Sequence, residues 1–355
     1  MKAVLVQTTV GDYRQAFVNE VTQRLGESFD ILCGKEYFYP SLKTGVVGPR
    51  VFVVAKNIFL FGRRGLLQLG VHRRAIQADV AVLEYNPRII NTWTVALLRK
   101  VLGRRTILWG HVHSRRGSDN WLRRFQRSLG TGLIVYTEEQ KQILIDELRY
   151  RGEAFAAPNA LYSQSEMCPL DSPDRRDFLY VGRLVPDKKP QLMVAAFAKA
   201  MPSLPADSRL LIVGDGPERP ALERLIETLN LKDRVILFGH VSNYEKLKSF
   251  YATSIASLSP GYVGLSITQS LGFGIPMIYS RDEPHAPETV AAKENWNCLI
   301  FETDSAEDFA EKMLQISREK AAWIQRTAAI SEDCRNKFSV ERMASEFVKA
   351  IRGHE

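Results

Sequence analysis

Short apolar runs alternate with longer amphipathic stretches along most of this chain of 355 residues. Runs that are apolar throughout suit strands of a sheet covered on both faces, and the stretches between them have helical periodicity. Such alternation predicts parallel sheets with right-handed crossovers. The expected strands are 4–6, 31–33, 51–54, 80–83, 106–109 and 133–136 in the first half, and 178–181, 210–213, 235–238, 255–258 and 277–279 in the second.

A stretch with little periodicity separates the two halves. It covers 156–177 and holds three prolines among small and polar residues, which is typical of a linker. We therefore predict an α/β fold with two doubly wound Rossmann-like domains, 1–155 and 178–335, facing across a cleft. Because open α/β sheets bind ligands at the carboxyl ends of their strands, the cleft is the expected site. A terminal segment, 336–355, should hold a last helix with Ser339 as its N-cap.

Charge is divided unevenly between the halves. Residues 1–160 contain 24 Lys and Arg against 13 Asp and Glu, whereas 161–355 contain 24 against 27. The net charge of +8 therefore comes entirely from the first half. This asymmetry suggests that one half meets a polyanion or an anionic membrane, and a generally basic proteome is the alternative explanation.

Several protein classes are excluded by composition. A hydrophobic content of 45% is too high for a disordered polymer. No apolar run approaches the ~18–20 residues of a membrane span, and the N-terminus turns polar at Gln7, too early for a signal-peptide core. The four cysteines lie far apart, so neither a disulfide framework nor a zinc site is expected. We expect a cytoplasmic protein without a metal ion or a cofactor.

The first candidate ligand site follows the strand 178–181. Gly182 permits a tight exit from the strand, and Arg183 and Lys188 stand five positions apart on the loop that follows. A forked guanidinium with a mobile ammonium is suited to a diphosphate. The alternative is a solvated basic loop before a helix.

Glycines also follow the next two strands. Gly214-Asp215-Gly216 lacks a third glycine and is more typical of a structural turn than of dinucleotide binding. After the next strand, the backbone of Gly239, His240 and Val241 could read a nucleobase edge.

The loop 259–265 leads into a helix whose N-terminus carries partial positive charge. The backbone amides of Gly264, Leu265 and Ser266 should point out of this end, which suits phosphate. Gln269, one turn further in, could reach a ribose hydroxyl.

These motifs, in this order, resemble the nucleotide-sugar domain of family four retaining glycosyltransferases, which have the GT-B fold. The resemblance covers about residues 178–302, ending with Gly274-x-Pro276 and the segment 285–299. It implies that Arg183 and Lys188 hold the donor diphosphate and act in catalysis. The run 260–265 resembles a bacterial polysaccharide-assembly subgroup.

The resemblance also exposes a departure from the family. The family loop has two glutamates with seven residues between them, and here Gly261 and Gln269 occupy those places. A Gln can still bind hydroxyls, whereas Gly261 has no side chain to contact the donor sugar. We interpret this as divergence rather than inactivity, and donor contacts are carried over onto Gly261, Tyr262, Val263, Gly264, Leu265 and Gln269.

The first half matches the family less closely. Gly11 stands alone where the family has a glycine-rich loop after its first strand, and it could present backbone amides to phosphate or sugar. His111 lies where the family often has a histidine near donor sugar and acceptor, so the resemblance implies a catalytic role for it; the alternative is a histidine satisfied by backbone. In this fold the first domain takes the acceptor. The residues assigned to the acceptor or membrane side are Arg14, His113, Arg115, Arg116, Arg123 and Arg124.

The resulting prediction is a retaining transferase that moves a hexosyl or deoxyhexosyl unit from a nucleotide sugar, with UDP or GDP as the expected nucleotide. The expected acceptor is a saccharide or lipid-linked saccharide in bacterial surface polysaccharide assembly, on the inner face of the plasma membrane. No nucleic-acid partner is expected. The alternative is a catalytically weak relative that binds nucleotide sugars or membranes within an assembly complex. The resemblance also implies that the last helix packs back on the first domain.

Overall fold

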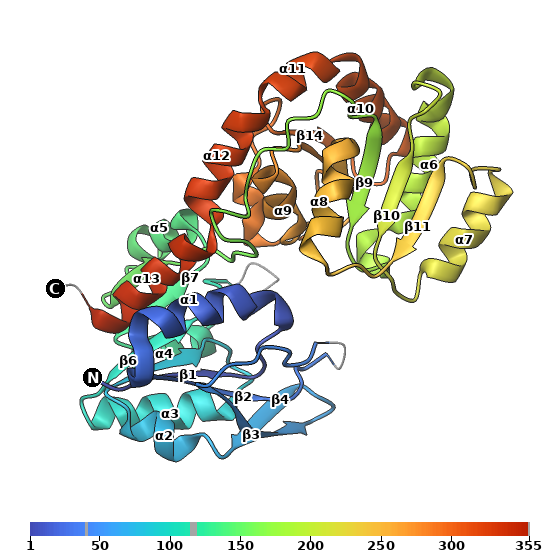
Figure 1. The fold of residues 1–355 in the computed structure, drawn as a ribbon. Coiled ribbons are helices and arrows are strands. Elements are labelled where there is room, and N and C mark those ends of the chain that lie inside the picture. The colour runs from blue at the N-terminus through green and yellow to red at the C-terminus, as the bar shows by residue number, and fades with distance from the viewer. Residues whose placement is uncertain (40–41, 114–118, 354–355) are drawn as a thin grey trace. The chain divides into compact units, whose positions relative to one another are not determined.

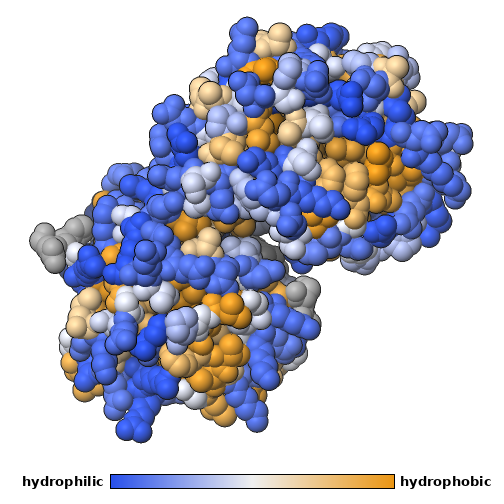
Figure 2. All heavy atoms as spheres, viewed as in Figure 1, coloured by the Kyte–Doolittle hydropathy of each residue, from blue (hydrophilic) through white to orange (hydrophobic). Residues whose placement is uncertain are grey.

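A computed structural model describes residues 1–39, 42–113 and 119–353. They form two compact units, each built on its own sheet (Figure 1). Unit 1 consists of 1–163 and 339–355, and unit 2 consists of 164–338. Apolar residues gather on part of the visible surface of each unit, with hydrophilic residues around them (Figure 2). None of the helices in the described ranges is long and apolar enough to cross a membrane.

In the described part of unit 1, the sheet has eight strands in the order β4-β3-β2-β1-β5-β6-β7-β8. Their bounds are β1 (Ala3–Gln7), β2 (Phe29–Gly34), β3 (Val51–Leu60), β4 (Gly65–Leu69), β5 (Val80–Glu84), β6 (Arg105–Trp109), β7 (Gly132–Val135) and β8 (Glu153–Ala156). Successive residues of β1 enter two different apolar clusters, Leu5 in one and Val6 in the other, so both faces of this strand are buried. This double burial is why its sequence is apolar throughout.

The expectation of purely parallel pairing was wrong at one edge of this sheet. β3 continues six residues beyond the expected end at 54 and pairs antiparallel with β4, which the sequence analysis missed. The second half of β3 is mostly half-exposed at this edge, so its residues need not form the continuous apolar run by which the other strands were recognised.

Within the described residues of unit 1, six helices accompany this sheet: α1 (Gln15–Leu25), α2 (His72–Gln77), α3 (Ile90–Val101), α4 (Trp121–Leu129), α5 (Glu138–Asp146) and α13 (Val340–Arg352). Local capping explains where three of them begin. The side chains of Asn120, Thr137 and Ser339 each accept a hydrogen bond from the backbone N–H three residues later. The predicted N-cap at Ser339 is thereby confirmed.

The helix α13 completes the core of unit 1, although unit 2 separates it from the rest of that unit in the sequence. Phe347 is fully buried, with its ring centroid 5.3 Å from that of Phe17, 5.2 Å from that of Trp109 and 5.8 Å from that of Phe29. Arg105 adds a hydrogen bond of 3.0 Å to the carbonyl of Ala350. One aromatic cluster thus joins α1, β2, β6 and α13.

The sheet of unit 2 has six parallel strands in the order β11-β10-β9-β12-β13-β14. The strands are β9 (Asp177–Val181), β10 (Leu210–Val213), β11 (Val235–Gly239), β12 (Ser254–Ser259), β13 (Met277–Ser280) and β14 (Cys298–Phe301). The helices are α6 (Pro190–Ala200), α7 (Arg219–Thr228), α8 (Tyr244–Thr253), α9 (Ser266–Gly272), α10 (Ala306–Arg318), α11 (Lys320–Gln325) and α12 (Thr327–Phe338). The strand β14 was not predicted from the sequence.

Each strand order places a topological switch point within its unit. In unit 2 the chain steps from β9 to β10 and β11 on one side, and then returns to place β12 on the other side of β9. In unit 1 the corresponding neighbours are β1 and β5. Loops that leave adjacent strands in opposite directions open a crevice at the carboxyl ends of those strands, where α/β folds bind ligands.

Candidate functional site

The switch point of unit 2 brings together two motifs that are more than seventy positions apart. The loop after β9 carries Lys188, and the loop after β12 carries Tyr262. The Tyr262 amide donates to the carbonyl of Asp187 at 2.9 Å, and Nζ of Lys188 donates to the carbonyl of Tyr262 at 2.5 Å. The same Nζ lies 4.8 Å from the centroid of the Tyr262 ring. These contacts hold the loop after β9 and the loop after β12 together.

Lys188 is the most perturbed cation of this cluster. Burial lowers the pKa of its ammonium to about 8, and the positive charge of Arg183 acts in the same direction. Arg183 itself is exposed, five residues before Lys188. Two cations of which one is partly desolvated favour an anion between them, because an anion would offset both the desolvation and the mutual repulsion.

Gly261 is required by the contact between these loops. A Cβ atom at this position would lie 2.4 Å from the carbonyl oxygen of Asp187 and 2.9 Å from the carbonyl carbon of Lys188. Both are backbone atoms, so they cannot move away cheaply. The loss of the family glutamate at this place thus accompanies a close approach of the two loops that excludes any side chain.

His285 also holds the loop after β12, a role that the sequence did not indicate. Its Nδ1 accepts from the Val263 amide at 3.0 Å, and its Nε2 lies 2.8 Å from the carbonyl of Ser280. Nδ1 must be unprotonated to accept, so Nε2 carries the hydrogen. Burial lowers the pKa of His285, which is consistent with a neutral ring. His285 therefore positions the segment that leads to Gly264 and Leu265.

Glycines just after β9 and β10 and at the end of β11 allow the ends of these three strands to approach closely. A Cβ on Gly214 would lie 1.8 Å from the carbonyl oxygen of Gly182, and the Gly214 amide donates to the carbonyl of Gly239 at 2.8 Å. These contacts support the structural-turn interpretation of Gly214. His240 is exposed just beyond β11 and Val241 is half-buried, two strands away from β9 in the sheet.

Gln269 lies in α9 with its side chain largely buried. Its Oε1 accepts a hydrogen bond from the hydroxyl of Tyr251 at 3.2 Å. Gly264 and Leu265 stand just before α9, where the first amides of a helix have no acceptor within it.

A second group of predicted residues lines a pocket of about 430 Å³ in unit 1. The pocket lies at the switch point between β1 and β5, with walls from the segments after β1, β5 and β6. The predicted residues that line it are Gly11, Arg14, His111, His113 and Arg123. The side chain of His111 is exposed, with its ring centroid 4.6 Å from that of Tyr136.

The residues of the predicted basic surface differ in how exposed they are. Arg123 is only 8% exposed, and its guanidinium donates to the carbonyls of His111 and Val112, so this residue cannot face a membrane. Arg124 is exposed and pairs with Asp119 at 3.3 Å. Arg115 and Arg116 lie outside the described residues. Within the described ranges, no group of three or more His, Cys, Asp or Glu side chains could hold a metal ion.

Comparisons with known proteins indicate which family this chain is similar to. Residues 169–335 match the family of glycosyl transferases group 1. The chain is 29% identical over 194 residues to an exopolysaccharide phosphotransferase of Streptomyces coelicolor, covering 53% of this chain and 20% of that protein. It is 28% identical over 151 residues to the alpha-monoglucosyldiacylglycerol synthase of Acholeplasma laidlawii, covering 42% and 32%. The chain thus spans a third or less of the length of these relatives.

Similarity to a solved structure extends over both units. The Anabaena protein HepE, solved in complex with UDP, aligns with a TM-score of 0.68 at 14% identity, covering 99% of this chain and 100% of that one. HepE has the GT-B fold, so the predicted pair of Rossmann-like α/β domains is confirmed.

Proposed function

Residues 169–335 match the glycosyl transferases group 1 family, and from this premise we propose that the chain is a retaining glycosyltransferase. It moves a hexosyl or deoxyhexosyl unit from a nucleoside diphosphate sugar to a saccharide or lipid-linked saccharide of a bacterial surface polysaccharide. The observation that carries this proposal is the half-buried ammonium of Lys188, held by the loop after β12 at the switch point of unit 2.

The chemistry assigned to this site is stabilisation of the leaving group. As the glycosidic bond to the donor phosphate breaks, negative charge grows on the diphosphate, and Arg183 and Lys188 attract that charge more strongly in the transition state than in the ground state. The amides at the start of α9 add partial positive charge. These donors require no metal ion. A leaving phosphate oxygen can accept the acceptor proton on the same face of the sugar, which retains the anomeric configuration.

UDP is the favoured donor nucleotide. The similar solved protein HepE is in complex with UDP, which supports a uridine nucleotide over the GDP alternative. The proposed base-reading segment is Gly239 to Val241 at the end of β11.

An anionic membrane is the proposed support for the acceptor, on the inner face of the plasma membrane. A surface that we call the α3–α4 face combines exposed apolar side chains of α3, α4 and the residue after α3: Leu97, Leu98, Val101, Leu102, Trp121 and Phe125. The rings of Trp93 and Phe125, 5.9 Å apart, join the two helices. Lys100 and Arg124 supply positive charge from the same helices. Apolar and aromatic residues interleaved with cations suit the headgroup region of an anionic leaflet.

The assay for the transferase follows nucleotide release. Purified protein with a panel of UDP- and GDP-sugars should release nucleoside diphosphate faster when membrane extract is added as the source of acceptor. Lys188→Ala should slow this release by at least about tenfold, since it removes a charge-assisted interaction. Lys199→Ala in α6, which removes an exposed lysine paired with Glu307, is the matched control and should leave the rate unchanged.

The alternative is a weak relative that binds nucleotide sugars without turnover, and Gly261 in place of the family glutamate is the observation that motivates it. Such a protein would bind UDP but release no nucleoside diphosphate from any donor of the panel. That result would exclude the transferase and favour the binding role.

A further inference from the structure

Buried arginines of unit 1 differ in how their guanidinium groups are satisfied. Arg99 is fully buried, and all three of its nitrogens donate, to the hydroxyl of Thr106 and to backbone carbonyls that include those of Ala75 and Asp79. Its charge is spread over carbonyl dipoles within the fold, so Arg99 needs no further ligand.

Arg14 is buried as well, but one of its nitrogens has no partner. Its side chain is 7% exposed; Nη2 donates to Oδ1 of Asn159 at 2.9 Å and Nε donates to the hydroxyl of Tyr13 at 3.4 Å. Nη1 is buried without a hydrogen-bond partner, although the hydroxyl of Tyr136 lies close to the guanidinium. Within the described part of the chain, no carboxylate forms an ion pair with Arg14. A buried charged group left unsatisfied in this way is costly, and an anion would offset that cost.

The guanidinium nevertheless stays protonated. Burial opposes the charge, yet the hydroxyls of Tyr13 and Tyr136 beside it hold the pKa of Arg14 above its ordinary value. Its Cζ also lies 4.7 Å from the centroid of the Trp109 ring, an arrangement that favours a cation. Arg14 is therefore a permanent cation in the wall of the pocket of unit 1.

Trp109, another residue that lines this pocket, carries a second unpartnered donor. Nε1 of Trp109 is buried without an acceptor, and Trp109 itself is 1% exposed. Arg88 and Arg123 add two further cations to the lining. The carboxylate among the lining residues is Glu84, which accepts from the Thr8 amide at 2.9 Å. The pocket therefore has an excess of positive charge and two buried N–H donors that need an acceptor.

We propose that this pocket binds an anionic oxygen of the acceptor substrate, a carboxylate or a phosphate, through Nη1 of Arg14 with the Trp109 indole N–H as a second donor. This inference rests on the proposed function, because it assigns the donor diphosphate to Lys188 in unit 2 and the acceptor to unit 1. An acidic sugar and a sugar phosphate present the same kind of oxygen, and a fork of N–H donors suits both.

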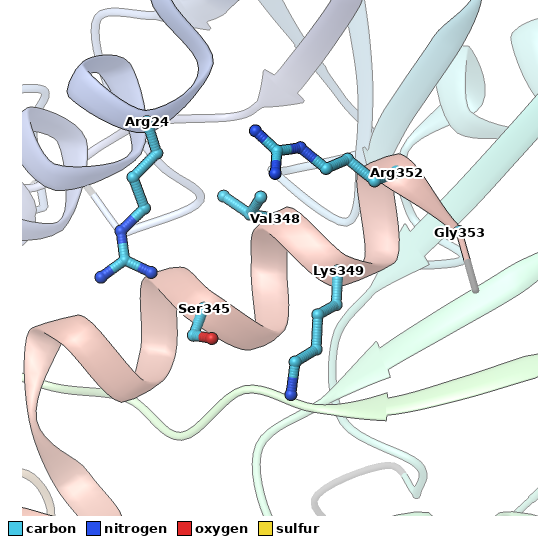
Figure 3. Close-up of a pocket in the computed structure, with 6 residues that line it drawn as sticks. All are labelled: Arg24, Ser345, Val348, Lys349, Arg352 and Gly353. Carbon is cyan, nitrogen blue, oxygen red and sulfur yellow. The ribbon is translucent and has the colours of Figure 1, made fainter. Parts of the chain in front are cut away.

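A second pocket of unit 1 is also lined by cations, and comparing the partners of those cations shows how Arg14 differs from a cation on the surface. Arg24 from α1 and Lys349 and Arg352 from α13 line a groove between these helices (Figure 3). There Arg24 pairs with Glu20 at 2.6 Å and Lys349 with Glu346 at 2.8 Å. Those two charges are already compensated within the fold, so this groove provides a matched control rather than a second site.

Binding of small probes to the full chain tests the proposal. Titration calorimetry with D-glucuronate, α-D-glucose 1-phosphate and D-glucose should show at least tenfold tighter binding of one or both anions than of neutral glucose. The two anions distinguish carboxylate from phosphate. Arg14→Gln should weaken anion binding at least tenfold, whereas Arg24→Gln should leave it unchanged. Equal affinity for glucose, or anion binding unaffected by Arg14→Gln, would overturn the inference.

Two further measurements keep the result interpretable. Trp109→Phe keeps a ring but removes the N–H, so it should also weaken anion binding, and this variant stands in if Arg14→Gln does not fold. UDP titrated into the same variants should bind as in the unaltered protein. A matching loss of UDP affinity in Arg14→Gln would place Arg14 on the donor and overturn the acceptor assignment. Failure of the transferase assay with intact anion binding would instead count against the proposed function alone.

Discussion

At the scale of single residues, Lys188 should make nucleotide binding depend on pH. Its pKa of about 8 means that the free protein carries this charge below pH 8 and loses it above. A diphosphate favours the protonated ammonium, so binding above pH 8 requires proton uptake, and UDP affinity should fall by up to about tenfold per pH unit. Calorimetry between pH 7 and 9.5 measures this fall. Lys188→Arg keeps its charge over this whole pH range, so UDP affinity of this variant should not change with pH. If UDP affinity of the unaltered protein did not change with pH either, the prediction would be contradicted.

At the scale of secondary-structure elements, α13 should be essential to the stability of unit 1. Phe347 packs against three aromatic side chains of that unit, so Phe347→Ala should destabilise it by about 3–5 kcal/mol. Hydrogen exchange read by mass spectrometry should accelerate in peptides of β1 and α1. Phe309→Ala, which removes a ring stacked 4.1 Å from Phe301 in unit 2, should instead accelerate peptides of that unit. Equal effects of both variants on both units would show that the assigned division between them is wrong.

At the scale of the whole molecule, the α3–α4 face should bind the protein to anionic vesicles. Each cation near an anionic surface contributes about 1 kcal/mol, so Lys100→Gln with Arg124→Gln should weaken binding about thirtyfold. Co-sedimentation with phosphatidylglycerol and phosphatidylcholine vesicles measures it, and added salt should reduce it. Lys199→Gln with Lys232→Gln removes two exposed charges of unit 2 and should change nothing. Binding insensitive to both anionic lipid and salt would rule out this docking.

Features that depend on neighbouring residues were predicted from the sequence, whereas features that depend on contacts between distant residues were not. Residues 169–335 match the family that the motifs of the second half resembled, and the predicted N-cap at Ser339 was confirmed because capping is a local interaction. The antiparallel pairing of β3 with β4 was not predicted, because a strand at the edge of a sheet need not be apolar on both faces. That Gly261 meets the backbone of Asp187 could not be read from positions so far apart. Arg14 and Arg123 resembled surface cations because sequence alone does not reveal burial.

The aromatic cluster at Phe347 also has a consequence for how the protein is made. Arg105 bonds to a residue 245 positions later, and the face of the sheet that carries Phe29 and Trp109 packs against a helix that the ribosome translates only after all of unit 2. At about 5–20 residues per second, that face of the sheet stays open for tens of seconds. Unit 1, most of which is translated before unit 2, is therefore completed after it. During that interval the nascent chain offers a chaperone an apolar face shaped for α13.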